Sequence, residues 1–185
     1  MDTSARPRKR RIAYNLPNHA HELTFSTFRR KPIFLYAEAC ELFVEALDAA
    51  RTSCNFELWA FVIMPDHCHV LLRPRDEVYA ISAILKAIKS PAAKAILERF
   101  PEWREELSVC RPTRGREARL WQQGGGYDRN ICTNRAAAAS INYIHMNPVR
   151  KGLCDNPEDW PWTSYRAYLN PPEDSGPVTK FVWQE

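Results

Sequence analysis

The chain has 185 residues, of which 45% are hydrophobic and 26% are charged, so it can bury an ordinary core and we expect one folded domain. Its formal net charge is +4, and positive residues gather at 6–11 and 29–31, which suits a polyanion such as nucleic acid, with a solvated surface as the alternative. The sequence contains no run of roughly 20 apolar residues for a membrane span, no secretory signal and no Cys-x-x-Cys pair, so we expect a cytoplasmic protein with reduced thiols.

The first half of the chain predicts a helix between strands. Residues 1–18 are basic and contain Pro and Asn, so we expect a flexible arm there. Apolar and polar side chains alternate along residues 21–29, as they do in a half-buried strand. Residues 34–51 have apolar side chains at helical spacing. A predicted hairpin follows, made of residues 56–64, the turn Pro65-Asp66 and residues 67–74.

A second helix and a fourth strand are predicted next. The helix begins near Ile81, and Pro91 is expected to kink it or to restart it with Ser90 as the N-cap. Within residues 116–131 the first half can form the strand, and Gly124-Gly125-Gly126 should be a mobile turn.

The last predicted helix begins with Asn134 as its cap and stops at Pro148, because the residue before a proline resists the helical conformation. The element order matches the ferredoxin-like plan, an α+β fold with an antiparallel four-stranded sheet and helices on one face, here with an added C-terminal helix. We divide the chain into an arm at 1–18, a domain at 19–169 and a C-terminal tail at 170–185.

Two histidines, His67 and His69, start the second strand of the predicted hairpin. Residues two apart in a strand project from one face, so these imidazoles point together and Cys68 points to the other side. Such a pair can share a divalent cation, and the alternative is two interior histidines bonded to their neighbours. A second His-x-His, at His19 and His21, precedes the first strand and is interpreted as local polar structure.

A tyrosine and an asparagine on the last predicted helix strengthen the metal hypothesis. Tyr143 and Asn147 are four residues apart, so they occupy one face of the helix at neighbouring turns. Two imidazole nitrogens and an amide oxygen suit Mg²⁺ or, better, Mn²⁺. A phenol beside such a metal can attack a phosphodiester and become covalently attached, whereas the alternative for Tyr143 is a core tyrosine.

Two motifs resemble those of REP-associated tyrosine transposases, relatives of the single-tyrosine insertion-sequence transposases. The stretch "MPDHCHVLL" is similar to the histidine-hydrophobic-histidine (HUH) motif of that family. The stretches "YIHMNPVRKGL" and "PEDWPWTSY" are similar to its tyrosine helix and C-terminal signature. The resemblance runs from about His21 to Tyr168 and implies a ferredoxin-like fold, which agrees with the predicted element order.

The resemblance also implies an activity, the metal-dependent cleavage and rejoining of single-stranded DNA next to imperfect palindromes that fold as hairpins. It implies that His67, His69 and Asn147 bind the metal and that Tyr143 is the nucleophile. The product would be a 5′-phosphotyrosine link and a free 3′-hydroxyl, formed at the nucleoid in the cytoplasm of a bacterium. Asp66 departs from the family pattern, because relatives often have Asn there, and it adds negative charge beside the expected metal.

Binding of single-stranded DNA needs cations for the backbone and flat side chains for unstacked bases. The candidate DNA-binding residues are Arg29, Arg30, Lys31, Lys86, Lys89, Arg150 and Lys151. The arm at residues 6–11 could reach a hairpin stem. Trp160, Trp162 and Tyr165 could stack on bases, but the proline between the two tryptophans favours packing of the tail onto the domain.

Three alternatives stay open at this point. A protein that binds DNA hairpins without cutting them needs the same cations, although every candidate active-site residue type is present. A structural zinc protein is disfavoured by the scattered cysteines. Tyr127 is a second candidate nucleophile by residue type, and we favour Tyr143 because Tyr127 falls in the predicted turn. Whether the chain acts as a monomer or a homodimer does not follow from the sequence.

Overall fold

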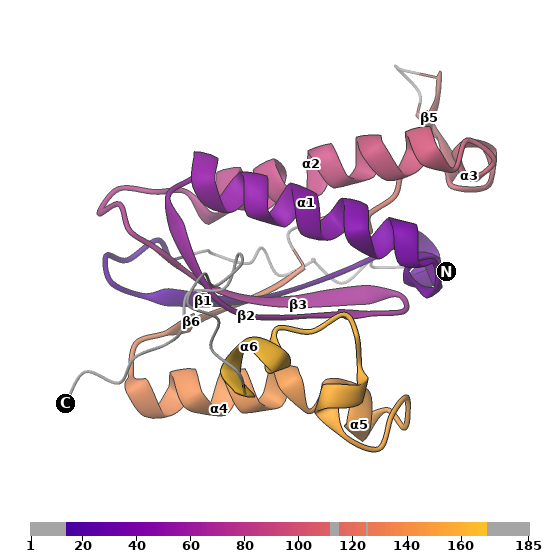
Figure 1. Ribbon diagram of the computed structural model, residues 1–185. Coiled ribbons are helices and arrows are strands. Elements are labelled where there is room, and N and C mark those ends of the chain that lie inside the picture. Colours follow the sequence, from indigo (N-terminus) through magenta and orange to yellow (C-terminus); the bar gives the residue numbers. More distant parts are fainter. Residues whose placement is uncertain (1–13, 112–114, 125, 170–185) are drawn as a thin grey trace, which may run out of the picture.

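A four-stranded antiparallel sheet forms the middle layer of the protein (Figure 1). The structure is a computed structural model, and it describes residues 14–111, 115–124 and 126–169. The strands are β1 (Ala20–Ser26), β2 (Phe56–Met64), β3 (His67–Pro74) and β6 (Tyr127–Ile131), in the order β2-β3-β1-β6. The predicted α+β class with such a sheet is confirmed. The basic run at 6–11, Gly125 and the tail at 170–185 lie outside the described residues.

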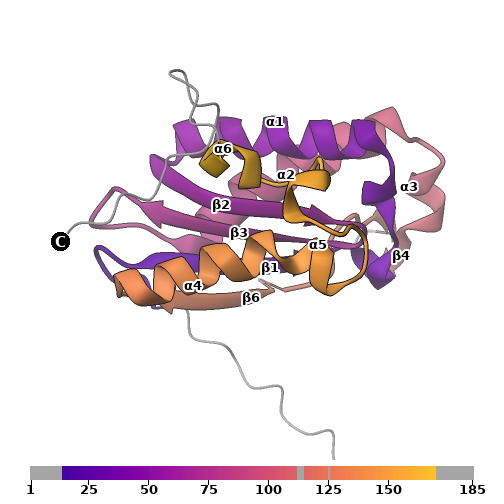
Figure 2. The same cartoon turned by 60° about the horizontal axis from the view of Figure 1, so that its bottom comes forward.

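Helices cover both faces of the sheet (Figures 1 and 2). On one face α1 (Ala37–Ser53) and α2 (Ile81–Arg99) pack over a core that includes Phe25, Phe43 and Ile88. On the other face lies α4 (Asn134–His145), whose apolar side chains Ile141 and Ile144 pack against the sheet. The two helices predicted between the strands therefore share a face, and the added third helix lies across the sheet from them.

The remaining elements are short: α3 (Trp103–Glu106), β4 (Ser108–Arg111), β5 (Gly115–Ala118), α5 (Asn147–Arg150), α6 (Tyr165–Leu169) and 3-10 turns at Phe28–Arg30, Ile33–Leu35 and Pro157–Asp159. β4 and β5 form a separate two-stranded hairpin. Among the described residues, the helices are all too short or too polar to cross a membrane.

The fourth strand of the sheet lies later in the chain than predicted. The sequence favours the first half of residues 116–131, but β6 occupies the second half. The first half contributes to β5 and then to an extended segment, in which Trp121 forms a β-bridge with Thr27. β6 buries only Ile131, so its hydrophobic alternation is too weak to identify a strand from the sequence.

The prediction that Pro91 restarts the second helix is wrong. α2 runs continuously through Pro91, and Ser90 lies inside it and not at a new N-cap. A proline inside a helix removes one hydrogen bond and crowds the preceding turn. Here Ile88, Ala92 and Ile96 are fully buried around it, so tertiary packing holds the helix together across the proline.

The boundaries of α4 also differ from the prediction. Thr133, and not Asn134, is the N-cap, because its hydroxyl accepts a hydrogen bond from the backbone N–H of Ala136 (3.2 Å). The helix ends at His145, and Pro148 lies in the first turn of α5, where a missing N–H costs nothing.

β1 ends at Ser26, before the predicted end at Arg29, because the chain turns sharply there. Arg29 and Arg30 have φ values of 54° and 58°. These left-handed conformations cost residues other than glycine about 1–2 kcal/mol each. The strained turn places both arginines at the end of β1, next to the start of β3.

The described part of the predicted arm is attached to the domain. The Tyr79 hydroxyl donates to the carbonyl oxygen of Leu16 (2.9 Å), and Nδ2 of Asn130 donates to that of Tyr14 (2.7 Å). The backbone N–H of Ile81 donates to the side-chain oxygen of Asn15 (3.1 Å). Residues 14–16 are therefore held beside the start of α2 and the end of β6.

Residues 160–164, which precede the C-terminal tail at 170–185 and which we call the tail segment, lie along the outer edge of β2. The backbone N–H of Ile63 donates to the carbonyl oxygen of Trp162 (2.8 Å), and that of Ser164 donates to the carbonyl oxygen of Phe61 (3.0 Å). The indole N–H of Trp160 donates to the carbonyl oxygen of Ile63 (2.9 Å). The predicted packing of the tryptophan-rich tail onto the domain is confirmed.

Ser164→Ala tests whether the tail holds α4 in place. Its buried hydroxyl accepts from the backbone N–H of Phe61 (2.9 Å) and lies 2.8 Å from Nε2 of His145 at the end of α4. Both groups lose this partner in the variant, so we expect the free energy of unfolding to fall by about 1–3 kcal/mol. Urea denaturation measures the loss. Ser53→Ala, which removes an exposed hydroxyl on α1, is the control and should be near neutral. Equal effects of the two variants would contradict the role of Ser164.

Gly126→Ala tests the close approach of the chain to β1. Gly126 has a φ of 76°, and a Cβ at this position would overlap the carbonyl oxygen of Thr24. Gly124 also has a positive φ, 100°, but a Cβ there meets nothing within 4 Å. Gly124→Ala should cost about 1–2 kcal/mol from the backbone alone, and Gly126→Ala about 1–3 kcal/mol more from overpacking. Thermal unfolding of both variants measures the difference, and equal losses would exclude the close approach.

Candidate active site

His67 and His69 lie side by side on the face of the sheet that α4 covers. Their ring centroids are 5.0 Å apart with the planes at 77°. Cys68 between them points to the opposite face and is fully buried in the core under α1 and α2. The alternation predicted for this strand is therefore present. The His67 side chain is 13% exposed and the whole of His69 is 5% exposed, so both imidazoles are largely shielded from bulk water.

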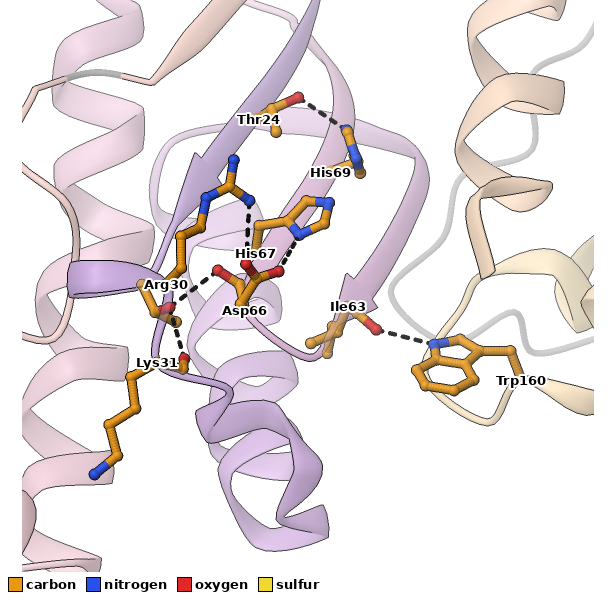
Figure 3. A network of polar contacts seen from close by, with 9 residues as sticks. Thr24, Arg30, Lys31, Ile63, Asp66, His67, His69 and Trp160 are labelled. Carbon is orange, nitrogen blue, oxygen red and sulfur yellow. Dashed lines mark hydrogen bonds and ion pairs between the residues drawn. The ribbon is translucent and has the colours of Figure 1, made fainter. Parts of the chain in front are cut away.

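Asp66 connects His67 to the strained turn at the end of β1 (Figure 3). One carboxylate oxygen lies 2.6 Å from Nδ1 of His67, and the other accepts from the Arg30 guanidinium (3.2 Å). Burial raises the pKa of the Asp66 carboxyl, but the hydrogen bond and charge of His67 and the charge of Arg30 outweigh it and hold this pKa below its usual value. A carboxylate only accepts hydrogen bonds, so Nδ1 of His67 is the donor to Asp66, and Nε2 is the ring nitrogen that does not face this carboxylate.

His69 is held by Thr24 from the neighbouring strand β1. The Thr24 hydroxyl oxygen lies 2.8 Å from Nδ1 of His69, because the two residues are register partners in the sheet. Burial, followed by the charge of His67, lowers the pKa of His69 to about 4. His69 is therefore neutral at neutral pH. Within the described residues, Nε2 of neither histidine has a hydrogen-bond partner.

Tyr143 on α4 stands over His69. The two rings meet edge to face, with centroids 5.7 Å apart and planes at 89°. The guanidinium carbon of Arg150 lies 5.2 Å from the centroid of the phenol ring. Tyr143 is 39% exposed, so its hydroxyl is open to a ligand. The structure therefore brings the predicted nucleophile next to one of the predicted metal ligands.

Asn147 follows this helix as the first residue of α5 and is 4% exposed. Its Nδ2 donates to the carbonyl oxygen of Tyr143 (3.2 Å). Its Oδ1 has no hydrogen-bond partner in the described part of the chain. A buried amide oxygen without a partner is uncommon in folded proteins, and a cation is one ligand that would satisfy it.

A cavity of about 730 Å³ opens beside these residues and is lined by Thr24, His69, Tyr143 and Arg150 among others. Tyr127 also lines it, because this residue is the first of β6 and not part of the predicted turn. The second candidate nucleophile is thus in the same cavity as Tyr143. The volume lies within the range of about 300–1,000 Å³ typical of ligand sites.

A polar cluster around the buried Glu22, which the sequence did not reveal, joins α4 to the sheet beside this cavity. Glu22 on β1 accepts from the guanidinium of Arg129 (2.6 Å) and from the hydroxyl of Ser140 (2.8 Å). Arg129 also donates to the Ser140 hydroxyl (2.7 Å). Glu22 is register partner to Arg129 across two strands that are far apart in the sequence, so no local signal could have identified the cluster.

The candidate DNA-binding cations fall into three groups. Arg29, Arg30 and Lys31 are at the end of β1, where Lys31 pairs with Glu106. Lys86 and Lys89 are on α2, across the sheet from Tyr143, and Arg150 and Lys151 follow α4.

The second His-x-His pair, His19 and His21, has hydrogen-bond partners of its own outside the candidate site. His21 is fully buried, with Nδ1 2.8 Å from Asp128 and Nε2 2.8 Å from the Tyr79 hydroxyl. His19 contacts Asn130, so this pair forms local polar structure as interpreted. Within the described residues, no group of three or more His, Cys, Asp or Glu side chains is arranged to hold a metal ion. A metal at His67 and His69 would therefore need an amide oxygen, water or phosphate to complete its ligands.

Comparisons with known proteins agree with the motifs. The family model of IS200-like transposases matches residues 15–147. A REP-associated tyrosine transposase of Haemophilus influenzae is 30% identical over 141 residues, and the match covers 71% of this chain and 75% of that protein. A solved structure of a REP-associated tyrosine transposase bound to a REP hairpin has a TM-score of 0.67 at 19% identity, and the match covers 96% of this chain and 98% of that one. The last likeness concerns the fold.

The family match covers most of the chain and includes His67, His69, Tyr143 and Asn147. The relative from Haemophilus influenzae matches over a similar length of sequence. The chain therefore belongs to the IS200-like transposase family, as a REP-associated tyrosine transposase of the single-tyrosine HUH type.

Proposed function

We propose that the chain is a metal-dependent endonuclease and strand transferase for single-stranded DNA, which acts next to hairpin-forming repeats through a covalent 5′-phosphotyrosine. The observation that carries the proposal is the packing of the Tyr143 ring against His69, with the phenol exposed to the cavity that both residues line. A phosphate that enters this cavity meets the phenol and His69 together. The place of action would be the cytoplasm of a bacterium, at the nucleoid.

In the proposed reaction, the phenol oxygen of Tyr143 forms a bond to the phosphorus of the scissile phosphodiester. The bond between phosphorus and the 3′ oxygen breaks, and its electron pair goes to that oxygen. The phenol loses its proton and the 3′ oxygen gains one, so the products are a 5′-phosphotyrosine and a free 3′-hydroxyl. Attack by another 3′-hydroxyl on the phosphotyrosine reverses these steps and rejoins the strand.

Arg150 would stabilise the charge that develops in this step. Its guanidinium lies against the face of the Tyr143 ring, and both line the cavity. A fixed cation aimed at the place where negative charge gathers lowers the barrier without reorganising during the reaction. Arg150 thus has a proposed role in the reaction as well as in holding DNA.

His67, His69 and Asn147 would hold the metal, through Nε2 of each imidazole and Oδ1 of the amide. In the described part of the chain these atoms have no hydrogen-bond partner, which supports the assignment, and Asp66 and Thr24 already occupy Nδ1 of the two histidines. A mixed set of nitrogen and oxygen ligands suits Mn²⁺ and also accommodates Mg²⁺. When bound there, the metal would polarise the scissile phosphate.

Single-stranded DNA that carries a hairpin is the proposed partner, and the backbone of its hairpin and unpaired parts would be contacted by Arg29, Arg30, Lys31, Lys86, Lys89, Arg150 and Lys151. The likeness in fold to a transposase that binds a REP hairpin supports this choice. Arg30 contacts Asp66, the partner of His67, and Arg150 lies against Tyr143, which packs on His69, so a strand that crosses the site would meet both groups. A protein that binds hairpins without cutting remains the alternative outcome of the next experiment.

Tyr143→Phe should abolish the covalent adduct with labelled hairpin DNA while hairpin binding stays intact, because only the nucleophilic oxygen is lost. Denaturing gels with Mn²⁺ measure the adduct, and gel retardation measures binding. Tyr127→Phe is the matched control, since its ring lines the same cavity. An adduct with Tyr143→Phe that disappears with Tyr127→Phe would move the nucleophile to Tyr127. Hairpin binding without any adduct from the unaltered chain would favour the binding-only function.

Asp66→Ala should weaken Mn²⁺ binding about 10-fold to 100-fold, because His67 loses the carboxylate that orients its ring. Calorimetric titration with Mn²⁺ alone measures this affinity independently of DNA cleavage. Asp48→Ala is the control, since Asp48 is on α1 across the sheet and pairs with Arg51. Unchanged Mn²⁺ affinity in Asp66→Ala would contradict the assignment of His67 as a ligand.

A further inference from the structure

A second cavity, of about 450 Å³, lies between α2 and residues 118–124, on the face of the sheet away from Tyr143. We call it the α2 cavity. Three cations line it, Lys86 and Lys89 from α2 and Arg119 from the facing segment. The hydroxyl groups of Ser82 and Ser90 lie on its wall as well. None of the described residues that line it is acidic, so the chemistry of the cavity is that of an anion site.

The three cations lack the carboxylate partners that other Lys and Arg residues of the described chain have. Lys31 pairs with Glu106, and Arg99 pairs with Glu38. By contrast, none of the three is in an ion pair within the described ranges 14–111, 115–124 and 126–169. Positive charge is therefore concentrated at this cavity, and the described residues supply no counter-charge to it.

Lys89 is half-buried, which makes the missing counter-charge more costly. Its ammonium donates to the carbonyl oxygen of Gly124 (3.3 Å) and lies 5.5 Å and 5.8 Å from the ring centroids of Phe25 and Trp121. Burial lowers the pKa of Lys89 below its usual value. An anion beside this ammonium would replace lost hydration, so binding of a phosphate is favoured here.

Phe28 connects the α2 cavity to the catalytic side of the molecule. The guanidinium carbons of Arg29 and Arg119 lie 4.9 Å and 5.7 Å from the centroid of its ring. The backbone N–H of Phe28 donates to the carbonyl oxygen of Leu120 (2.7 Å), which fixes the facing segment against the end of β1. Arg30 follows and contacts Asp66, the partner of His67. Cations thus continue around the end of β1 from the cavity to the histidine pair.

We propose that the α2 cavity binds backbone phosphates of the unpaired strand that flanks the hairpin. This inference rests on the proposed function, because it takes single-stranded DNA as the ligand. A single strand is narrow and flexible enough to follow the cations around the end of β1 and enter the cavity. A hairpin stem is a double helix and could lie only across the mouth. Contact with backbone phosphates would be independent of base sequence.

The test compares a bare hairpin with the same hairpin carrying an unpaired extension on either side, both bound to the Tyr143→Phe chain so that no cleavage occurs. In the double variant Lys86→Ala and Arg119→Ala, affinity for the extended hairpin should fall at least about tenfold, because two charge-assisted contacts are lost. Affinity for the bare hairpin should stay unchanged. The salt dependence for the extended hairpin should decrease by about 0.7 for each phosphate contact removed.

The control is the double variant Lys94→Ala and Arg116→Ala, which removes the same charge from exposed positions on α2 and β5 outside the cavity. It should not distinguish the two hairpins. If the cavity variant loses affinity equally for both hairpins, the stem binds in the cavity and the proposal is overturned. The proposal is also overturned if this variant loses affinity for neither hairpin. Tight binding of a free deoxynucleoside monophosphate, abolished in the cavity variant, would assign the cavity to a mononucleotide and also overturn it. Because binding is measured without cleavage, the result can be interpreted even if the chain proves not to cleave DNA.

Discussion

The site depends on the pleat of β3 and on the register that pairs this strand with β1 and β2. The pairing places Thr24 opposite His69 and Met64 opposite His67, so both imidazoles meet their neighbours on one face. A slip of one residue would turn Cys68 toward α4 and drive the two histidines into the apolar core. Packing of Cys68 and its apolar neighbours under α1 and α2 opposes that slip, so the core on one face determines the chemistry on the other.

The position of α4 is set by two kinds of contact. Apolar side chains of the helix pack on the sheet and fix its distance from the strands. Ser140, held by Glu22, and His145, held by Ser164, flank Tyr143 in the sequence. Directional hydrogen bonds on both sides of one residue limit rotation of the helix about its axis in a way that apolar contact alone does not. The phenol is thereby kept over His69.

Much of this arrangement could be predicted because the regular spacing of apolar residues can be recognised within a short stretch of sequence. The hairpin of β2 and β3, the common face of the two histidines and the amphipathic α1 all follow from spacing within a few residues. The partners of those histidines could not be predicted in the same way. Thr24 reaches His69 only through strand pairing, and Arg30 reaches Asp66 only because the chain adopts two left-handed residues after β1.

The other differences between prediction and structure also come from contacts between residues that are far apart in the sequence. β6 has little hydrophobic alternation and is a strand because β1 offers it an edge, so its position depends on tertiary pairing. α2 passes through Pro91 because buried residues on both sides of the proline hold it against the core. Asn147 is four residues beyond Tyr143, as the spacing required, although a helix break at Met146 separates them. Local rules located the residues, and long-range packing determined the elements that carry them.

The tail segment 160–164 has a consequence beyond the position of α4, because β2 is an edge strand of the sheet. β2 is almost wholly apolar and buried, and an uncovered edge of that kind is a template on which other chains add strands. The tail occupies its outward backbone groups: Ile63 and Phe61 bond to tail residues, and the Tyr168 hydroxyl donates to the carbonyl oxygen of Trp59 (2.6 Å). The same segment that orients the helix carrying Tyr143 therefore also protects the protein from self-association through its most hydrophobic strand.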